Sequence, residues 1–217
     1  MPAYFSMTLQ FENERIKPDF VRRVYSEIIS CGYDFKSGFW FHQNANLNEI
    51  IEWNQNLLEQ GFKLGYTQHV KHDYMQILFA SEIYSELRGF WMYSDEEIAF
   101  DLIIPEGDIL NCEGGNAFVD NKVVPIKELA VKLWEASVVD AIQTSLELDN
   151  GYHPLNKVFA GVNIAVNPFA IVKEEVYKKF PEGFFADKLV SSIGNDGILT
   201  ESNGTTPNYF VEADAVN

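Results

Sequence analysis

Carboxylates are the side chains of this sequence that come closest to a chemical pattern. Asp101, Glu106 and Asp108 lie at or just beyond the end of an alternating apolar segment, where the paired carboxylates of a glycosidase can lie. Acid–base work usually draws on a His or Lys as well, and no Lys, Arg or His occurs from Gly89 to Asn121. Clustered charge of one sign without such partners favours binding over catalysis.

Histidines and cysteines provide two weaker patterns. His69 and His72 stand three residues apart beside Asp73, and two His with a carboxylate can hold a transition metal. Their neighbours are polar and lack a helical stripe, so we expect an exposed loop and no metal. Cys112 and His153 could in principle pair as nucleophile and base, but Cys112 has no basic neighbour to activate its thiol. The sequence contains no nucleophile elbow, dinucleotide fingerprint or phosphate loop, and it predicts no catalytic residue and no cofactor.

A predicted β-hairpin, Glu86 to Pro105, positions many of the acids. Its second arm alternates so that one face is apolar, and residues 94–97 form a polar turn. We expect the hairpin and its flanks to turn their carboxylates outward as one negative patch. The predicted binding residues are Asp95, Glu96, Glu97, Asp101, Glu106 and Asp108, with Trp91 or Tyr93 as an aromatic anchor. Trp40 is a further candidate for a surface contact.

The remaining elements follow from periodicity and capping signals. Alternation predicts a strand over residues 5–11, and apolar stripes predict helices over 20–31, 46–60 and 125–148. Other expected strands and a short helix are weaker: strands near 39–41, 74–80, 158–166 and 208–211, and a helix over 167–179. Residues 73–85 fit either a strand or a helix, and pairing with the hairpin favours the strand.

These elements predict an α+β fold with an antiparallel or mixed sheet of about five to seven strands. Three or four helices cover mainly one face of the sheet. We expect a single domain over residues 1–217, with a weak internal boundary in the glycine-rich loop at 107–121.

The charge balance restricts the partners that the protein can bind. The formal net charge is −16, from 32 Asp and Glu against 16 Lys and Arg. A surface this negative repels phosphate backbones and anionic membranes, and it attracts a basic protein. Two cysteines do not make a disulfide scaffold. With no signal segment and no long apolar run at hand, we expect a cytoplasmic protein.

In size, charge and aromatic content the chain resembles the acidic immunity proteins that neutralise cationic bacterial toxins, although no shared motif supports the comparison. That resemblance implies a non-catalytic module that binds a basic protein. Two alternatives stay open. One is a small hydrolase with carboxylate or His chemistry, and the other is a structural protein whose rings form a homo-oligomer.

Overall fold

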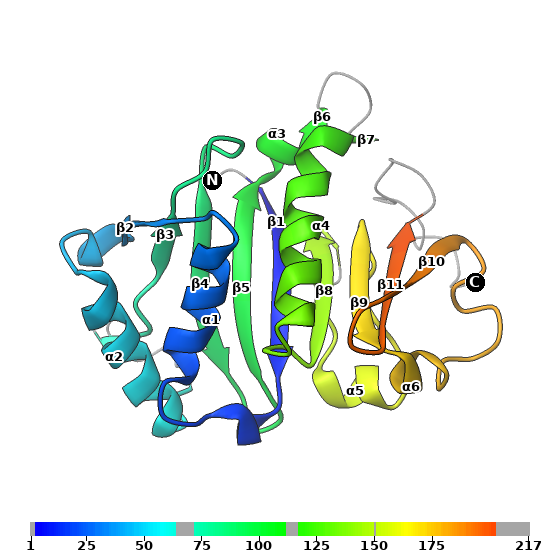
Figure 1. The fold of residues 1–217 in the computed structure, drawn as a ribbon, viewed down its shortest axis with the longest axis horizontal. Coiled ribbons are helices and arrows are strands. Elements are labelled where there is room, and N and C mark those ends of the chain that lie inside the picture. Colours follow the sequence, from blue (N-terminus) through cyan, green and yellow to red (C-terminus); the bar gives the residue numbers. More distant parts are fainter. Residues whose placement is uncertain (1–2, 64–71, 112–116, 150, 203–217) are drawn as a thin grey trace, which may run out of the picture.

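A nine-stranded sheet organises the computed structural model, which describes residues 3–63, 72–111, 117–149 and 151–202. The strand order is β10-β11-β9-β8-β1-β5-β4-β3-β2, and every neighbouring pair is antiparallel. Figure 1 shows helices α1, α2 and α4 side by side on one face of this sheet. A second, two-stranded sheet pairs β6 with β7.

The element bounds are as follows. The strands are β1 (Tyr4–Phe11), β2 (Phe35–Gly38), β3 (Ile77–Phe79), β4 (Leu87–Tyr93), β5 (Ile98–Pro105), β6 (Leu110–Asn111), β7 (Ala117–Phe118), β8 (Ala141–Leu146), β9 (Phe169–Lys173), β10 (Lys188–Ile193) and β11 (Gly197–Ser202). The helices are α1 (Phe20–Ser30), α2 (Leu47–Glu59), α3 (Glu106–Ile109), α4 (Asp120–Glu135), α5 (Leu155–Phe159) and α6 (Glu174–Tyr177).

The predicted α+β class and the antiparallel hairpin are confirmed, but the predicted sizes are wrong. The main sheet has nine strands where we expected five to seven, and the described ranges contain six helices where we expected three or four. The expected helix over 125–148 stops at Glu135, because Ser137 adopts a left-handed φ of 56° and residues 141–146 enter the sheet beside β1. The strands of the main sheet that the sequence did not predict therefore lie mainly in the second half of the chain.

Three other boundaries also differ from expectation. Residues 155–159 form helix α5 in place of the strand expected from 158, and Phe169–Lys173 is a strand in place of a helix. Residues 40–42 form a 3₁₀ turn beyond β2. The strand expected at 208–211 lies outside the described residues. Strands from both sides of the 107–121 segment belong to the same sheet.

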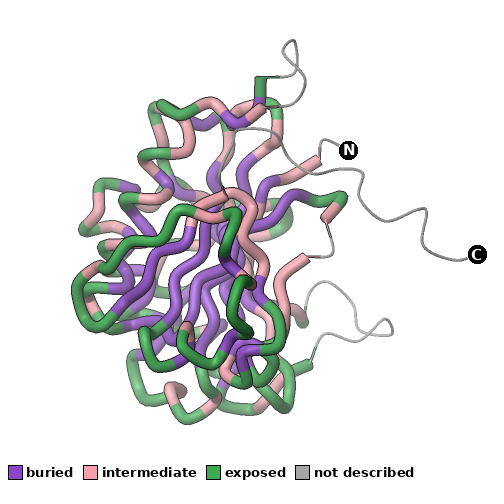
Figure 2. The backbone as a smooth tube through the Cα atoms, turned by 90° about the vertical axis from the view of Figure 1, so that its right-hand side faces the viewer, coloured by how far each residue is buried: buried purple, intermediate pink, exposed green. Residues whose placement is uncertain are grey.

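The larger core lies between the sheet and helices α1, α2 and α4. Alternate residues of β1 and β5 (Phe5, Met7, Leu9, Phe11, Ile98, Phe100, Leu102 and Ile104) point into it and are fully buried. Helix α2 begins with a complete capping box, in which Glu49 N donates to Asn46 Oδ1 at 3.1 Å and Asn46 N to Glu49 Oε2 at 2.8 Å. Figure 2 shows the buried strands enclosed by more exposed turns and helix surfaces.

A smaller core lies on the opposite face, behind β8 and β9. Ala141, Ala170 and Val172 pack there against α5, α6 and the residues that follow α6. Phe185, from the residues that follow α6, packs against two other rings, with centroid distances of 4.9 Å to Tyr177 at the end of α6 and 5.0 Å to Phe180. Helix α5, between β8 and β9, and the chain from α6 to Phe185 therefore cover the sheet face that the long helices leave open.

Candidate functional site: an acid-rimmed cleft

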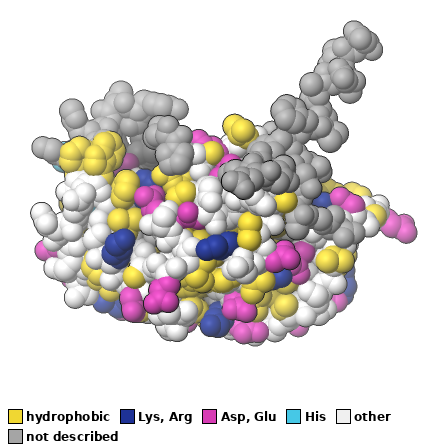
Figure 3. Space-filling model, turned by 90° about the horizontal axis from the view of Figure 1, so that it is seen from above, with side chains coloured by type: hydrophobic (Ala, Val, Ile, Leu, Met, Phe, Trp, Pro, Cys, Tyr) yellow, Lys and Arg dark blue, Asp and Glu magenta, His cyan; other side chains and the backbone are white. Residues whose placement is uncertain are grey.

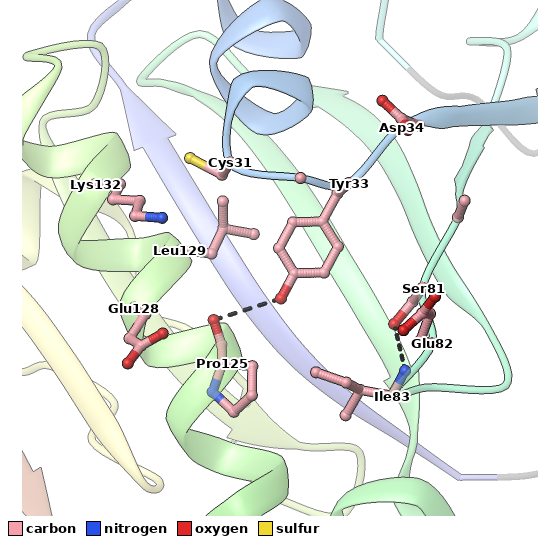
Figure 4. Close-up of a pocket in the computed structure, with 12 residues that line it drawn as sticks. Cys31, Tyr33, Asp34, Ser81, Glu82, Ile83, Pro125, Glu128, Leu129 and Lys132 are labelled. Carbon is pink, nitrogen blue, oxygen red and sulfur yellow. Dashed lines mark hydrogen bonds between the residues drawn. The ribbon is translucent and has the colours of Figure 1, made fainter.

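A cleft of about 570 Å³ opens between three segments that are distant in sequence. They are the turn after α1, the loop after β3, and the stretch of α4 from Pro125 to Lys132 (Figure 4). The lining residues are Cys31, Gly32, Tyr33, Asp34, Ala80, Ser81, Glu82, Ile83, Pro125, Glu128, Leu129 and Lys132. This volume lies in the range of ordinary ligand sites in proteins.

Backbone and side-chain hydrogen bonds fix the walls of the cleft. Gly32 has a φ of 96°, which lets the chain reverse after α1 and brings the Tyr33 ring against α4. The Tyr33 hydroxyl lies 3.4 Å from the Pro125 carbonyl oxygen, to which it donates, and Ala80 N donates to Asp34 O at 2.7 Å. Within the loop after β3, Ile83 N donates to the Ser81 hydroxyl at 3.1 Å. The cleft is therefore preformed.

The start of α4 is tied to the same loop. Tyr84 donates its hydroxyl to the Lys122 carbonyl oxygen at 2.6 Å, and the Lys122 ammonium donates to the Ile83 carbonyl oxygen at 3.1 Å. Burial is the main cause that raises the pKa of Tyr33, and the nearby Cys31 and Glu128 add to it. The neutral phenol is therefore the form that lines the cleft.

The floor and the rim of the cleft differ in chemistry. Leu129 is 1% exposed and Tyr33 is 9% exposed, and together with Ile83 they make an apolar floor. The rim carries three exposed carboxylates, Asp34, Glu82 and Glu128, and one exposed amine, Lys132. None of these four side chains forms an ion pair or hydrogen bond with any described residue. This arrangement suits a ligand that has an apolar stem and a positive head.

Trp91, predicted with Tyr93 as a candidate aromatic anchor for a partner, does not lie at the surface. Trp91 is 3% exposed and donates its indole N–H to the Tyr25 hydroxyl at 2.8 Å. Its ring lies 4.6 Å from the Phe100 ring and 5.8 Å from the Phe11 ring. Tyr93 is half-buried against the same core. Trp91 packs against rings of α1, and Tyr93 lies beside Gly61, just after α2.

The six predicted acids do not form one outward patch. Asp95 and Glu96 lie at the tip of the β4–β5 hairpin, whereas Glu106 and Asp108 follow the far end of β5 (Figure 1). Asp95 pairs with Lys63, and Glu96 accepts from Asn156 Nδ2 at 2.8 Å.

At the far end of β5, Glu106 accepts from Glu147 N at 3.1 Å, and Asp108 accepts from both Ser85 N and Ser85 Oγ at 2.6 Å. The other two acids, Glu97 and Asp101, are 5% and 7% exposed. The expectation of outward carboxylates is therefore wrong for these two, while a binding role for the six acids stays a prediction.

Glu97 and Asp101 belong to a buried polar group on the sheet face opposite the long helices. Glu97 accepts from Leu155 N at 2.6 Å and from Gln10 Nε2 at 2.8 Å. Gln143 donates to the His153 carbonyl oxygen at 2.8 Å and accepts from Ala165 N at 2.7 Å. The segment between β8 and β9 is thus fastened to the sheet through side chains that point away from the main core.

Burial shifts the ionisation of this group. It raises the pKa of Asp101 from 3.8 to about 6, while the adjacent Thr8 hydroxyl acts in the opposite sense. Burial also raises the pKa of Glu97 and of Tyr152, and it lowers the pKa of His153. Asp101 Oδ1 and Thr8 Oγ1 are both buried without a hydrogen-bond partner among the described residues. The carboxyl is therefore closed off from a substrate in this conformation.

The sequence did not point to Thr8, Gln10, Gln143 or Tyr152 as members of this group. Thr8 lies opposite Asp101 on one side and opposite Gln143 on the other. Thr8 lies 93 residues from Asp101 and 135 residues from Gln143 in the sequence, so no local pattern records that pairing. The only usable sequence signal was the presence of polar residues, such as Thr8, Gln10 and Gln143, within the segments that form β1 and β8.

Metal and membrane features can be stated for the described ranges. Within residues 3–63, 72–111, 117–149 and 151–202, no three or more His, Cys, Asp or Glu side chains are arranged to hold a metal ion. His69 and Cys112, from the two weaker sequence patterns, lie outside the described residues. No helix in the same ranges combines the length and apolar character needed to cross a membrane.

Comparisons with known proteins add no relative. No family model, no curated protein and no solved structure matches this chain. The functional argument therefore depends on the geometry and chemistry of the cleft and of the surface around it.

Proposed function

We propose that this chain is a non-catalytic binding protein whose acid-rimmed cleft receives a Lys or Arg side chain from a basic partner protein. The observation that carries the proposal is the pairing of an apolar floor, Tyr33 and Leu129, with three exposed rim carboxylates. Lys and Arg side chains have matching parts, because they bury an aliphatic stem while keeping the charged head near the surface.

The charge of the whole molecule supports the same partner. With 32 acidic and 16 basic side chains, the protein attracts cationic surfaces over a distance and repels anionic ones. Figure 3 shows acidic side chains distributed over the face seen from above, with basic ones between them. Long-range attraction accelerates the encounter, and the cleft supplies the local contact that selects the partner.

Two features argue for binding in preference to hydrolysis. Of the three described carboxyls whose pKa is raised, Glu97 and Asp101 are buried beneath the segment between β8 and β9, and Asp73 is half-buried outside the cleft and accepts from Tyr74 N. The rim carboxylates of the cleft are accessible, but no His among the described residues lines the cleft beside them. Acid–base catalysis needs a titratable group within reach of the substrate, so the accessible acids fit recognition better.

An immunity-type inhibitor of a cationic toxin is the finer form of this proposal. It requires the partner to be a basic enzyme, and the resemblance in size, charge and aromatic content supports it. A homo-oligomer fits less well, because two copies of net charge −16 repel each other.

The first test uses hexalysine and hexaarginine peptides as probes, with hexaglutamate as the negative control. Binding is measured by fluorescence anisotropy at about 0.01 M and about 0.15 M ionic strength, where the Debye length is ~30 Å and ~8 Å. We expect Glu82→Gln/Glu128→Gln to weaken cationic peptide binding about fivefold, since each exposed charge contributes up to ~1 kcal/mol.

A matched variant separates the cleft from total charge. Glu175→Gln/Glu182→Gln removes the same two charges from exposed positions outside the cleft. If this control weakens binding as much as the cleft variant, attraction is only diffuse and the cleft is not the site. If the wild-type chain binds neither cationic peptide, the proposed function is wrong.

A further inference from the structure

Two large aromatic side chains near the edge of the sheet are mostly exposed to solvent. Trp40 is 60% exposed and Phe41 is 63% exposed, directly after edge strand β2. Their rings stack on each other, with centroids 4.8 Å apart and planes 20° apart. Figure 3 shows hydrophobic side chains gathered at the left end of the molecule, the end where Figure 1 places β2. We call Trp40 and Phe41 the ring pair.

The backbone holds the ring pair outward. Trp40 has a left-handed φ of 53°, a conformation that a bulky residue rarely adopts. His42 N donates to Phe39 O at 3.1 Å, and Phe39 N donates to Gln76 O at 3.0 Å. A side chain at Gly38 would overlap the His42 carbonyl oxygen, so glycine is needed where the turn folds back. Strained residues of this kind persist where the surrounding structure over-determines them, and they cluster at functional sites.

The chemistry of the rings selects the occupant. The face of an indole ring is electronegative and attracts a guanidinium or ammonium group. The molecule already shows this contact beside the ring pair, where the Arg88 guanidinium carbon lies 4.2 Å from the centroid of the Phe39 ring. Because the net charge is −16, an approaching cationic partner is attracted, and a second copy of this chain is repelled.

We infer that the ring pair is a second contact for the basic partner and that it receives an arginine side chain on an exposed aromatic face. This inference rests on the proposed function. Asp34 of the cleft and Trp40 of the ring pair flank β2, a strand of four residues, which spans roughly 13 Å. One partner of ordinary size can therefore cover both sites, since a standard interface buries about 800 Å² on each side.

The test compares hexaarginine with hexalysine, because arginine stacks on aromatic rings better than lysine does. Of the four tryptophans, Trp91 and Trp134 are 3% exposed and Trp53 is half-buried, so quenching of exposed tryptophan emission reports on Trp40. We expect the wild-type chain to bind hexaarginine about threefold more tightly than hexalysine, with a change in that emission. Trp40→Ala should remove the preference, and Trp40→Phe should keep part of it.

Leu148→Ala serves as the matched control, because Leu148 is a 77% exposed apolar residue elsewhere on the surface. It should leave the arginine preference intact, and thermal unfolding should show that each variant is folded.

If Trp40→Ala leaves hexaarginine binding unchanged while Glu82→Gln/Glu128→Gln weakens it, the ring-pair inference is wrong and the proposed function stands. If Trp40→Ala instead abolishes a concentration-dependent dimer seen by sedimentation, the occupant is a second copy and the inference is also wrong. If only Trp40→Ala acts, the cleft fails and the ring pair stands.

Discussion

The β4–β5 hairpin and the cleft are both rich in acidic residues, but they use them differently. In the hairpin, Glu97 and Asp101 are buried, and Asp95 is paired with Lys63. In the cleft, Asp34, Glu82 and Glu128 are exposed and have no partner among the described residues. A run of acidic residues in the sequence therefore does not show where negative charge lies on the surface. Segments elsewhere in the chain bury some of these carboxylates and pair others with basic side chains.

The same contrast separates the tryptophans of the two regions. Trp91 of the hairpin is enclosed by the rings of Tyr25, Phe20 and Phe100. Among the described residues, Trp40, near the cleft, stacks on one ring, the exposed Phe41. The hairpin supports the core, whereas the cleft and the ring pair are the two places where we propose that a partner binds. Three measurements can break or sharpen this contrast.

The largest effect is expected from Trp91→Ala. Removing a fully enclosed indole leaves a cavity and deprives Tyr25 of a hydrogen bond, and such changes cost about 3–5 kcal/mol in the free energy of unfolding. Urea denaturation measures this loss, with Trp40→Ala as the exposed control, which should change stability far less. A loss below ~1 kcal/mol would mean that Trp91 is not part of the core.

A smaller and pH-dependent effect is expected from Asp101→Asn. The pKa of Asp101 in the folded protein is raised to about 6, so its protonated form favours folding. This contribution is complete below the unfolded-state pKa of 3.8 and is lost as the pH rises through about 6, a change of roughly 3 kcal/mol. Above that pH the buried carboxylate costs stability that an asparagine side chain does not.

The measurement compares the free energy of unfolding of the two proteins at about pH 4.5 and about pH 8. The advantage of Asp101→Asn should grow by about 2 kcal/mol over this range. The Asp101 carboxylate in turn raises the pKa of Glu97 and of Tyr152, as a lesser cause than burial at both groups, so their titration changes by a smaller amount when Asp101 is replaced. An equal pH dependence in both proteins would contradict the burial of an ionising carboxyl at this position.

The smallest effect on folding is expected from Glu82→Gln/Glu128→Gln. Both side chains are exposed and make no ion pair with a described residue, so the free energy of unfolding should stay within ~0.5 kcal/mol of the wild type. The same variant is the one expected to weaken cationic peptide binding. A large loss of stability in thermal unfolding would show that the rim carboxylates support the fold, and the contrast with the hairpin would then disappear.

Errors in the sequence-based predictions cluster where tertiary context overrides local pattern. The first half of the chain was predicted well. β1, α1, α2 and the hairpin have clear periods, and α2 has a capping signal as well. In the second half, the stripe of α4 runs on into Val138 and Ile142, although the helix ends at Glu135. A short apolar run fits a helix or a buried strand equally well until its sheet neighbours are known.

The sequence by itself determined the α+β class, the negative charge and the apolar alternation of the central strands, because these depend on composition and on neighbours a few residues apart. The tertiary structure alone decided which carboxylates are buried. Thr8 meets Asp101 across β1 and β5, and Leu155 supplies its N–H to Glu97 from a segment 58 residues away. The tertiary structure also formed the cleft, because the walls of the cleft come from three segments that are separate in the sequence. Whether a carboxylate is exposed depends on what packs over it, and that packing joins residues that no local pattern connects.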